Sequence, residues 1–341
     1  MPMNITFSEG SGLNDSIYGK CQAPIRMFLE QRGEQFEQQS VIKDLFLMGT
    51  SDNYGDMMTT MTAMDGFQPV GENGAYPADG MQEGYNKMLI YETWKDSFSV
   101  SREMIEDGKL LDMKKQPAAF MTSYNRTREL FGAALYGGAI KGQSSVKFRG
   151  KTFDITGADG SAIFHTAHKP KVKGATQTNK FSDAFSVDAL GRAETAMHLF
   201  KGDDDNILDV APNTILIPED ADLKKEVFAA IGADKDPVTA NNAFNYQYGR
   251  WNVIIWSYLN QFITSGTKPW ILLDTGYNET YGGAVWNDRV KLAVRSTIDE
   301  NTDANVWRGR SRFNATFNDW RFACIGGITG GTELATLKLQ G

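Results

Sequence analysis

The stretch from Glu83 to Arg128 constrains the fold of this chain more than any other part of the sequence. Between residues 86 and 101 the apolar side chains fall on even positions: Met88, Ile90, Trp94, Phe98 and Val100. Side chains at every second position share one face of a strand, so this alternation predicts a long extended strand. The odd positions, such as Lys95, Ser97 and Ser99, predict a solvated or partner-facing side.

A long helix is predicted directly after this strand. The segment SREMIEDGK ends the strand, and Pro117 suits the first turn of a helix. Four apolar residues then recur at helical spacing: Phe120, Tyr124, Phe131 and Leu135. We expect a helix over about 116–138, roughly 30 Å long at about 1.5 Å per residue, which fades at Gly137-Gly138.

Residues 49–84 are rich in glycine and methionine, and their tip GENGAYPADG is typical of a turn. The simplest reading is an extended hairpin whose returning limb is the strand described above. A lone two-stranded hairpin is marginal in water, and its exposed edge favours pairing with another chain. We therefore expect it to lie on a neighbouring subunit, through contacts that include Met81, Tyr85, Met88 and Tyr91. The alternative is a flap packed on its own domain.

The second half of the chain predicts an α/β unit followed by a β-hairpin. NTILIPE, WNVIIWSYL and PWILLDT are predicted strands, ADLKKEVFAAIG is a predicted helix, and residues 233–250 form a long polar loop. Residues 285–327 then alternate apolar and basic side chains, which predicts a hairpin with one apolar and one cationic face. We expect Arg289, Arg308, Arg310 and Arg312 to meet acids of another copy, such as Asp203–Asp205 or Glu103. The alternative is a solvated face.

The chain has 341 residues and a net charge of −7, enough length for a sizeable core and two domains. The negative charge disfavours a dedicated nucleic-acid binder but permits the lining of a container. Neither an apolar run long enough for a membrane span nor a secretory signal is seen. The two cysteines, Cys21 and Cys324, are predicted to be unreactive thiols.

Motif searches predict no catalytic, cofactor-binding or metal-binding residues. His165 and His168 of HTAH would point to opposite faces of a strand, without an adjoining carboxylate or cysteine cluster. Asp203–Asp205 lack the ligand spacing of an EF-hand. The sequence contains no P-loop, no GxGxxG between a strand and a helix, and no GxSxG. We therefore predict that the chain is not an enzyme.

The order of these motifs resembles the major capsid proteins of tailed bacteriophages. The motifs that carry the resemblance span residues 12 to 327: EGYNKMLIYETWKDSFSVSREMIEDG, the long helix, AIFHTAHKP with QTNKFSDAFSVDALGRAETAM, NTILIPEDADLKKEVFAAIG, the two strands that follow, and the late DWRF hairpin. The resemblance implies the HK97-like fold, an α+β fold. In it an N-terminal arm and an extended hairpin loop (E-loop) accompany a peripheral domain with a long spine helix and an axial α/β domain.

Carried onto this chain, the resemblance implies a specific layout. The arm is residues 1–50, the extended loop 51–100, the peripheral domain 101–185 with 285–341, and the axial domain 186–284. The spine helix is about 116–138, and the loop 233–250 lies near the capsomer axis. Some relatives carry a scaffolding segment or a crosslink between subunits; here a separate scaffold and no crosslink are expected.

The implied function is a major capsid protein that assembles into hexamers and pentamers around double-stranded phage DNA. Its partners would be copies of itself, a scaffolding protein, a portal and possible decoration proteins, with the DNA contacted only non-specifically. It would assemble in the host bacterial cytoplasm and reside in the virion. The alternatives are an encapsulin-like nanocompartment shell protein and a soluble α/β enzyme with a flap.

Overall fold

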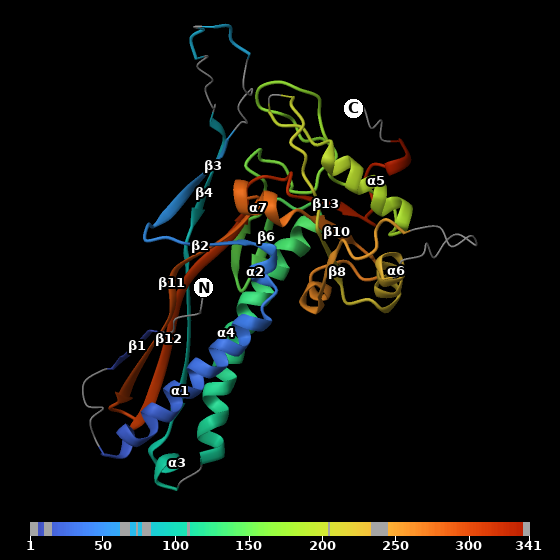
Figure 1. Cartoon of the computed structure of the whole chain (residues 1–341). Helices are drawn as coiled ribbons and strands as arrows, with labels where there is room; N and C mark the ends of the chain where they lie inside the picture. Colours follow the sequence, from blue (N-terminus) through green and yellow to red (C-terminus); the bar gives the residue numbers. More distant parts are fainter. Residues whose placement is uncertain are drawn as a thin grey trace.

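In the computed structural model, the chain forms an elongated body with a two-stranded hairpin projecting from one end (Figure 1). The structure describes the backbone of residues 6–9, 16–61, 69–72, 74–76, 83–107, 110–203, 205–232 and 245–336. Side chains are described for the same residues except 6–9, 16–24, 61, 83 and 110–114. Helices and strands are mixed along the chain, so the predicted α+β class is confirmed.

A five-stranded sheet runs along the body and is centred on a long antiparallel pair, β11 and β12. Its strands are β1 (Thr6–Glu9), β11 (Ala284–Asp299), β12 (Ala304–Phe317) and β5 (Glu92–Val100), in that order, with β2 (Leu47–Thr50) also paired to β11. The β11–β12 pair is the hairpin that the alternation predicts. Trp307, Phe313 and Phe317 are buried, whereas Arg308 and Arg310 are exposed.

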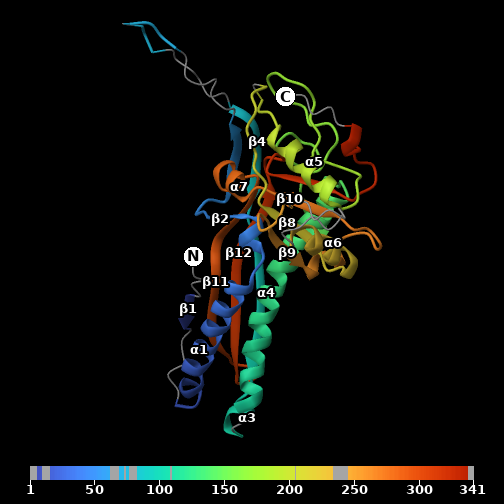
Figure 2. The same ribbon diagram turned by 45° about the vertical axis from the view of Figure 1, so that its right-hand side comes forward.

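Helices cover one face of this sheet (Figures 1 and 2). The longest is α4 (Leu110–Ile140); the others are α1 (Ser16–Gln39), α2 (Ile42–Leu45) and α3 (Arg102–Glu106). The predicted stripe on α4 is confirmed for Phe120, Phe131 and Leu135, which are buried. The predicted start is wrong, because α4 begins seven residues before Pro117 and contains it. A proline beyond the first turn costs a helix about 3 kcal/mol, because it removes one backbone hydrogen bond and its ring crowds the carbonyl four residues earlier. The 31-residue helix nevertheless continues through Pro117.

A second, four-stranded sheet forms the compact end of the molecule. Its order is β13 (Ala323–Gly326), β10 (Trp270–Leu273), β8 (Thr214–Pro218) and β9 (Asn252–Trp256). Around it lie α5 (Val187–His198), α6 (Ala221–Ile231), α7 (Thr275–Tyr281), η1 (Ser257–Gln261) and η2 (Leu334–Thr336). Ser186 caps α5 through the Ala189 amide, as predicted, and Asp220 caps α6.

Two further two-stranded sheets complete the described fold. One is the projecting hairpin of β3 (Gly55–Met61) and β4 (Glu83–Ile90), and the other joins β6 (Ser145–Phe148) to β7 (Lys151–Asp154). The segment AIFHTAHKP forms only isolated bridges, between Thr156 and Ala162 and between His168 and Gln177. The loop predicted over 233–250 lies outside the described residues up to 244.

The long helix α4 joins two hydrophobic cores. Its second half, from Phe131 to Ile140, packs into the main core with the four-stranded sheet. Its first half supplies Phe120 and Met121 to a smaller core beneath the far end of the five-stranded sheet, where α1 contributes Ile25 and Leu29. The arm helix therefore completes a core of its own subunit in this structure.

The strand predicted over 86–101 is two strands whose inward faces differ. In β4 the odd positions point inward, and Leu89 is buried, as is Tyr91 directly after this strand. In β5 the even positions, such as Trp94 and Val100, point inward. The phase changes at Tyr91, which interrupts the strand where it passes from the projecting hairpin into the long sheet. The sequence prediction placed Met88 and Ile90 on the apolar inward row, which is wrong, because both are exposed.

The helix α4 does not fade at Gly137-Gly138 but continues to Ile140. A Cβ on Gly137 would lie 2.3 Å from the Phe262 Cβ, so this glycine allows the segment after η1 to approach the helix. Alanine in a helix interior normally stabilises by about 1 kcal/mol relative to glycine. We predict that Gly137→Ala instead destabilises the fold, because overpacking costs about 1–3 kcal/mol.

Gly276 in α7 provides the matched control for this substitution. Its nearest neighbour for an added Cβ is the Asp274 carboxylate at 3.4 Å, an ordinary contact. Chemical denaturation should give Gly137→Ala a lower free energy of unfolding than the wild type. Gly276→Ala should have the same free energy of unfolding as the wild type or a higher one. A stabilised Gly137→Ala variant would contradict the packing role assigned to this glycine.

Candidate assembly surfaces

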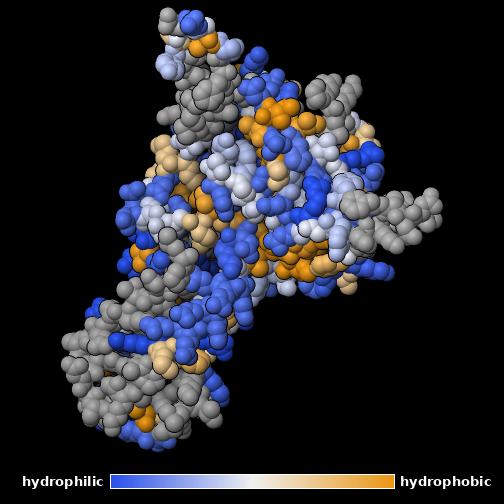
Figure 3. Space-filling model, in the orientation of Figure 1, coloured by the Kyte–Doolittle hydropathy of each residue, from blue (hydrophilic) through white to orange (hydrophobic). Residues whose placement is uncertain are grey.

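The projecting hairpin β3–β4 exposes methionines along its length. Met57 is 70% exposed and Met88 is 57% exposed, and the two residues are directly opposite each other in the strand register. At the described part of its tip Tyr76 is 99% exposed, and Figure 3 shows hydrophilic and hydrophobic residues side by side there. Apolar surface held away from the body is typical of a protein contact site. Met81 lies outside the described residues.

Two lysines fix the base of this hairpin to its own subunit. The Lys87 Nζ donates to the Thr156 carbonyl and lies 3.5 Å from an Asp154 carboxylate oxygen. Burial lowers the pKa of Lys87, and Asp154 opposes that shift. The Lys171 Nζ donates to the Gly84 carbonyl and lies 5.5 Å from the centre of the Tyr85 ring. Tyr85 is therefore half-buried at the base.

Tyr91 is only 3% exposed and serves as an internal anchor. Its hydroxyl donates to Asp56, and the Asn287 amide donates to the same hydroxyl at 3.1 Å. Burial and the Asp56 hydrogen bond raise the pKa of Tyr91. The structure thus joins β3, β4 and β11 at the point where the strand changes phase, and Tyr91 is not part of the exposed surface.

The predicted arginine row divides between exposed and anchored side chains. Arg308 and Arg310 are exposed on the sheet face opposite α4. Arg312 is half-buried and donates to the Tyr91 carbonyl at 3.4 Å, and Arg289 is half-buried beside a bulge of β11. Among the acids predicted to meet them, Asp203 is buried and bound to Arg321 at 2.9 Å within its own chain, whereas Glu103 is exposed.

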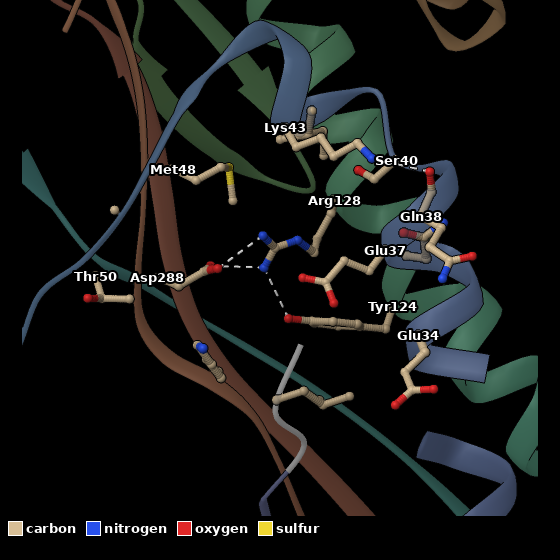
Figure 4. Close-up of a pocket in the computed structure, with 15 residues that line it drawn as sticks. Glu34, Glu37, Gln38, Ser40, Lys43, Met48, Thr50, Tyr124, Arg128 and Asp288 are labelled. Carbon is tan, nitrogen blue, oxygen red and sulfur yellow. Dashed lines mark hydrogen bonds and ion pairs between the residues drawn. The ribbon is translucent and has the colours of Figure 1, made fainter. Parts of the chain in front are cut away.

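A cleft of about 650 Å³ separates the arm from the long sheet (Figure 4). At its floor the Arg128 guanidinium meets the Asp288 carboxylate with two hydrogen bonds, of 2.9 and 3.1 Å. The guanidinium carbon also lies 4.8 Å from the centre of the Trp286 ring. Bidentate geometry and ring contacts suit arginine for a buried pair. This pair ties the spine helix to β11.

The neighbouring residue Glu129 joins three parts of the fold. Its carboxylate accepts hydrogen bonds from the Ser40 hydroxyl at 2.7 Å, the Val41 amide at 3.2 Å and the Trp256 indole at 2.9 Å. Burial raises the pKa of Glu129, and these hydrogen bonds act against that shift. Neither Arg128 nor Glu129 is predicted as a functional residue from the sequence. The feature of the sequence that could have indicated them is the pair of adjacent charged residues, Arg128 and Glu129, within the apolar stripe of the predicted helix.

Glu129→Gln is expected to cost about 1–3 kcal/mol, because the amide places a donor against the donors that the carboxylate accepts. The pKa of Glu129 is higher in the folded chain than in the unfolded chain. Its contribution to stability is therefore complete below about pH 4.5 and falls as the pH rises through the folded value. The free energy of unfolding lost in the variant should therefore shrink as the pH rises above about 4.5.

Urea denaturation of the wild type and Glu129→Gln at several pH values measures this difference. The exposed Glu226→Gln variant, on α6, is the matched control and should lose nothing. A loss that grows with rising pH would contradict the assignment.

His168 has a structural role that no sequence motif indicates. Its ring nitrogens lie 2.7 Å from an Asp159 carboxylate oxygen and 3.2 Å from the Asn179 side-chain oxygen, and its ring stacks 4.3 Å from Trp320. A single carboxylate, that of Asp159 in a neighbouring loop, adjoins His168. Across the described residues, no group of three or more His, Cys, Asp or Glu side chains could hold a metal ion.

A family model described as phage capsid protein matches residues 92–325 of the chain. The chain belongs to the phage capsid protein family. This capsid protein is therefore a structural component of the virion, as its resemblance predicts, and copies of it build a shell. No curated protein sequence matches it significantly. In the described helices, no segment is long and apolar enough to span a membrane.

Solved structures that match the chain over most of its length come from two bacteriophages and a virus-like particle. A structure from Mycobacterium phage Patience is 11% identical, covering 97% of the capsid protein and 95% of its own chain, with a TM-score of 0.48. The head structure of Helicobacter pylori bacteriophage KHP40 is 9% identical over 82% and 87%, with a TM-score of 0.45. A virus-like particle from Pyrococcus furiosus is 10% identical over 91% and 99%, with a TM-score of 0.44.

Proposed function

We propose that this capsid protein is the major head protein of a tailed bacteriophage, forming hexamers and pentamers that close into an icosahedral shell around double-stranded DNA. The observation that carries the proposal is the family match over residues 92–325. Ring-shaped capsomers need heterologous contacts, in which one surface of a subunit meets a different surface of the next. The projecting hairpin and the exposed sheet face are two such different surfaces.

The proposed domains follow the layout predicted from the sequence. Residues 1–50 are the arm, 51–100 the extended loop, 101–185 with 285–341 the peripheral domain, and 186–284 the axial domain. The strand pairing adds one detail: β13, at 323–326, belongs to the small sheet with β10 and β8. A separate scaffolding protein, a portal and decoration proteins are the proposed partners, and assembly takes place in the host bacterial cytoplasm.

Sedimentation of the purified protein tests this proposal. A major head protein is expected to sediment as capsomers and much larger closed particles, alone or with its scaffolding protein. An enzyme with a flap would remain a monomer or dimer under the same conditions, and that result would overturn the proposal. Small particles of uniform size that contain a cargo protein and no DNA would instead indicate a nanocompartment shell protein.

A further inference from the structure

One face of the long helix α4 meets both the arm and the compact end of the molecule. Glu129, Gly132 and Tyr136 are three and then four residues apart, so they lie one above the other on that face. Each of them lies against the arm turn, defined as residues 40–46, and each lies against Trp256 of β9. We call these three residues of α4 the joint.

Glu129 divides its two carboxylate oxygens between the arm turn and the compact end. Its Oε1 accepts hydrogen bonds from the Ser40 hydroxyl and the Val41 amide, and its Oε2 accepts the Trp256 indole N–H at 2.9 Å. The residue is only 4% exposed, so water does not replace a donor that is lost. Buried hydrogen-bond networks act as a unit, and a change on one side of this carboxylate therefore alters the bonds on the other side.

The other two positions of the joint repeat this double contact through packing. A Cβ on Gly132 would lie 3.2 Å from the Trp256 ring and 3.5 Å from the Phe46 ring, so both rings approach the helix backbone there. The Tyr136 hydroxyl donates to the Leu45 carbonyl at 3.2 Å. The Tyr136 ring centre lies 5.4 Å from that of Phe46 and 6.0 Å from that of Trp256. Interiors packed this closely transmit a displacement to their neighbours.

Beside the joint, a cleft of about 820 Å³ lies between the arm turn and the four-stranded sheet. Its lining includes Lys43 and Phe46 on the arm side, and Thr214 and Asn252 at the starts of β8 and β9 on the other side. The cleft gives the arm turn room to shift relative to the compact end, and the joint restrains that shift.

We infer that the joint couples the arm turn to the compact end, so that a perturbation of one is transmitted to the other through Glu129, Gly132 and Tyr136. The inference goes beyond the proposed function, because it concerns the single subunit. Coupling between two sites is reciprocal, so it acts equally from the arm turn to Trp256 and from Trp256 to the arm turn. In a shell, a contact made at the compact end would thereby change the arm of the same subunit.

Amide hydrogen exchange of the full-length protein tests the coupling in both directions. Trp256→Phe keeps an aromatic ring at the compact end and removes the indole donor. In this variant the amides of residues 40–46 are expected to exchange at least about ten-fold faster than in the wild type, the effect of losing one hydrogen bond to a charged group. Ser40→Ala changes only the arm turn and is expected to accelerate exchange in β9.

Each substitution has a matched control outside the joint. Trp270 is fully buried in the same sheet as Trp256, and its indole donates to the Asp183 carbonyl at 3.1 Å. Trp270→Phe should therefore leave exchange in residues 40–46 unchanged. The Ser51 hydroxyl donates to Asp56 at 2.8 Å, so Ser51→Ala should leave exchange in β9 unchanged.

Gly132→Ala is a second variant, which removes no hydrogen-bond donor. Its added methyl group meets the rings of Trp256 and Phe46 together, and overpacking displaces neighbouring side chains. Faster exchange is expected both in residues 40–46 and in β9. This variant carries the test if Trp256→Phe does not yield folded protein.

The pattern of exchange decides the outcome. Faster exchange on the side opposite each substitution, absent from both controls, supports the coupling. A change confined to the substituted side overturns it. Equal acceleration of residues 40–46 in Trp270→Phe also overturns it, because the effect would then be a general loss of stability. The proposed function is tested separately by sedimentation, so either conclusion can fail without the other.

Discussion

Removing residues 71–80 is expected to leave a stable, folded subunit that no longer forms closed shells. The described residues of this tip are all exposed, and neither hydrophobic core includes any of the described residues between 47 and 88. Unfolding should therefore occur at the wild-type temperature within about 2 °C, since surface changes usually alter stability by less than about 0.5 kcal/mol. Assembly should fall at least ten-fold, because the tip is the part of the hairpin with the greatest reach.

The measurement is sedimentation of the deletion variant beside a second variant in which residues 71–80 are replaced by ten glycine and serine residues. The replacement keeps the length of the hairpin and removes its charge and its Tyr76 side chain. If both variants fail to assemble, the chemistry of the tip matters and not only its length. Normal shells from the deletion variant would refute the assembly role of the hairpin.

Asp288→Ala is expected to be the most damaging single substitution at the surfaces described above, costing about 3–5 kcal/mol. It leaves the Arg128 guanidinium buried among Tyr124, Trp286 and Phe313 without its carboxylate partner. Removing one member of a buried ion pair costs that much because the remaining charge stays desolvated. Urea denaturation of the purified variant measures the loss.

The double variant Arg128→Met with Asp288→Leu is the control for this prediction. Replacing both charges with apolar side chains of similar volume is often close to neutral. The double variant should therefore recover most of the stability that Asp288→Ala loses. A loss below about 1 kcal/mol in the single variant would show that Arg128 finds solvent or another partner.

The regular parts of the fold could be predicted because each repeats a local pattern. The β11–β12 hairpin alternates apolar and basic residues over its whole length, and α5 and α6 combine an apolar stripe with a capping residue. The order of these elements along the chain gave the family resemblance, which the family match confirms. These features depend on neighbours in sequence, so the sequence alone reveals them.

The features that the sequence did not reveal depend on contacts between distant segments. The change of phase at Tyr91 arises because Asp56 and Asn287, 35 residues before it and 196 after it, bind its hydroxyl. Glu129 looks like a solvated helix residue until Ser40 and Trp256 are seen to donate to it. Gly137 is typical of a helix end in the sequence, whereas in the structure it lies inside the helix, where Phe262 packs against it.

The arrangement of charged residues is revealed partly by the sequence and partly by the structure. The acidic content of residues 44–86 is visible in the sequence, and so is each basic residue of the long hairpin. The structure adds the strand register, which places Lys95 beside Arg310 and Arg295 beside Arg308. It also shows that all four side chains are exposed.

Electron microscopy of the protein expressed together with its scaffolding protein tests the central claim most directly. We expect closed particles of uniform diameter whose averaged images show five-fold and six-fold capsomers, with density for the hairpin extending over the adjacent subunit. Monomers or small oligomers under all conditions, in protein that is folded by circular dichroism, would contradict it.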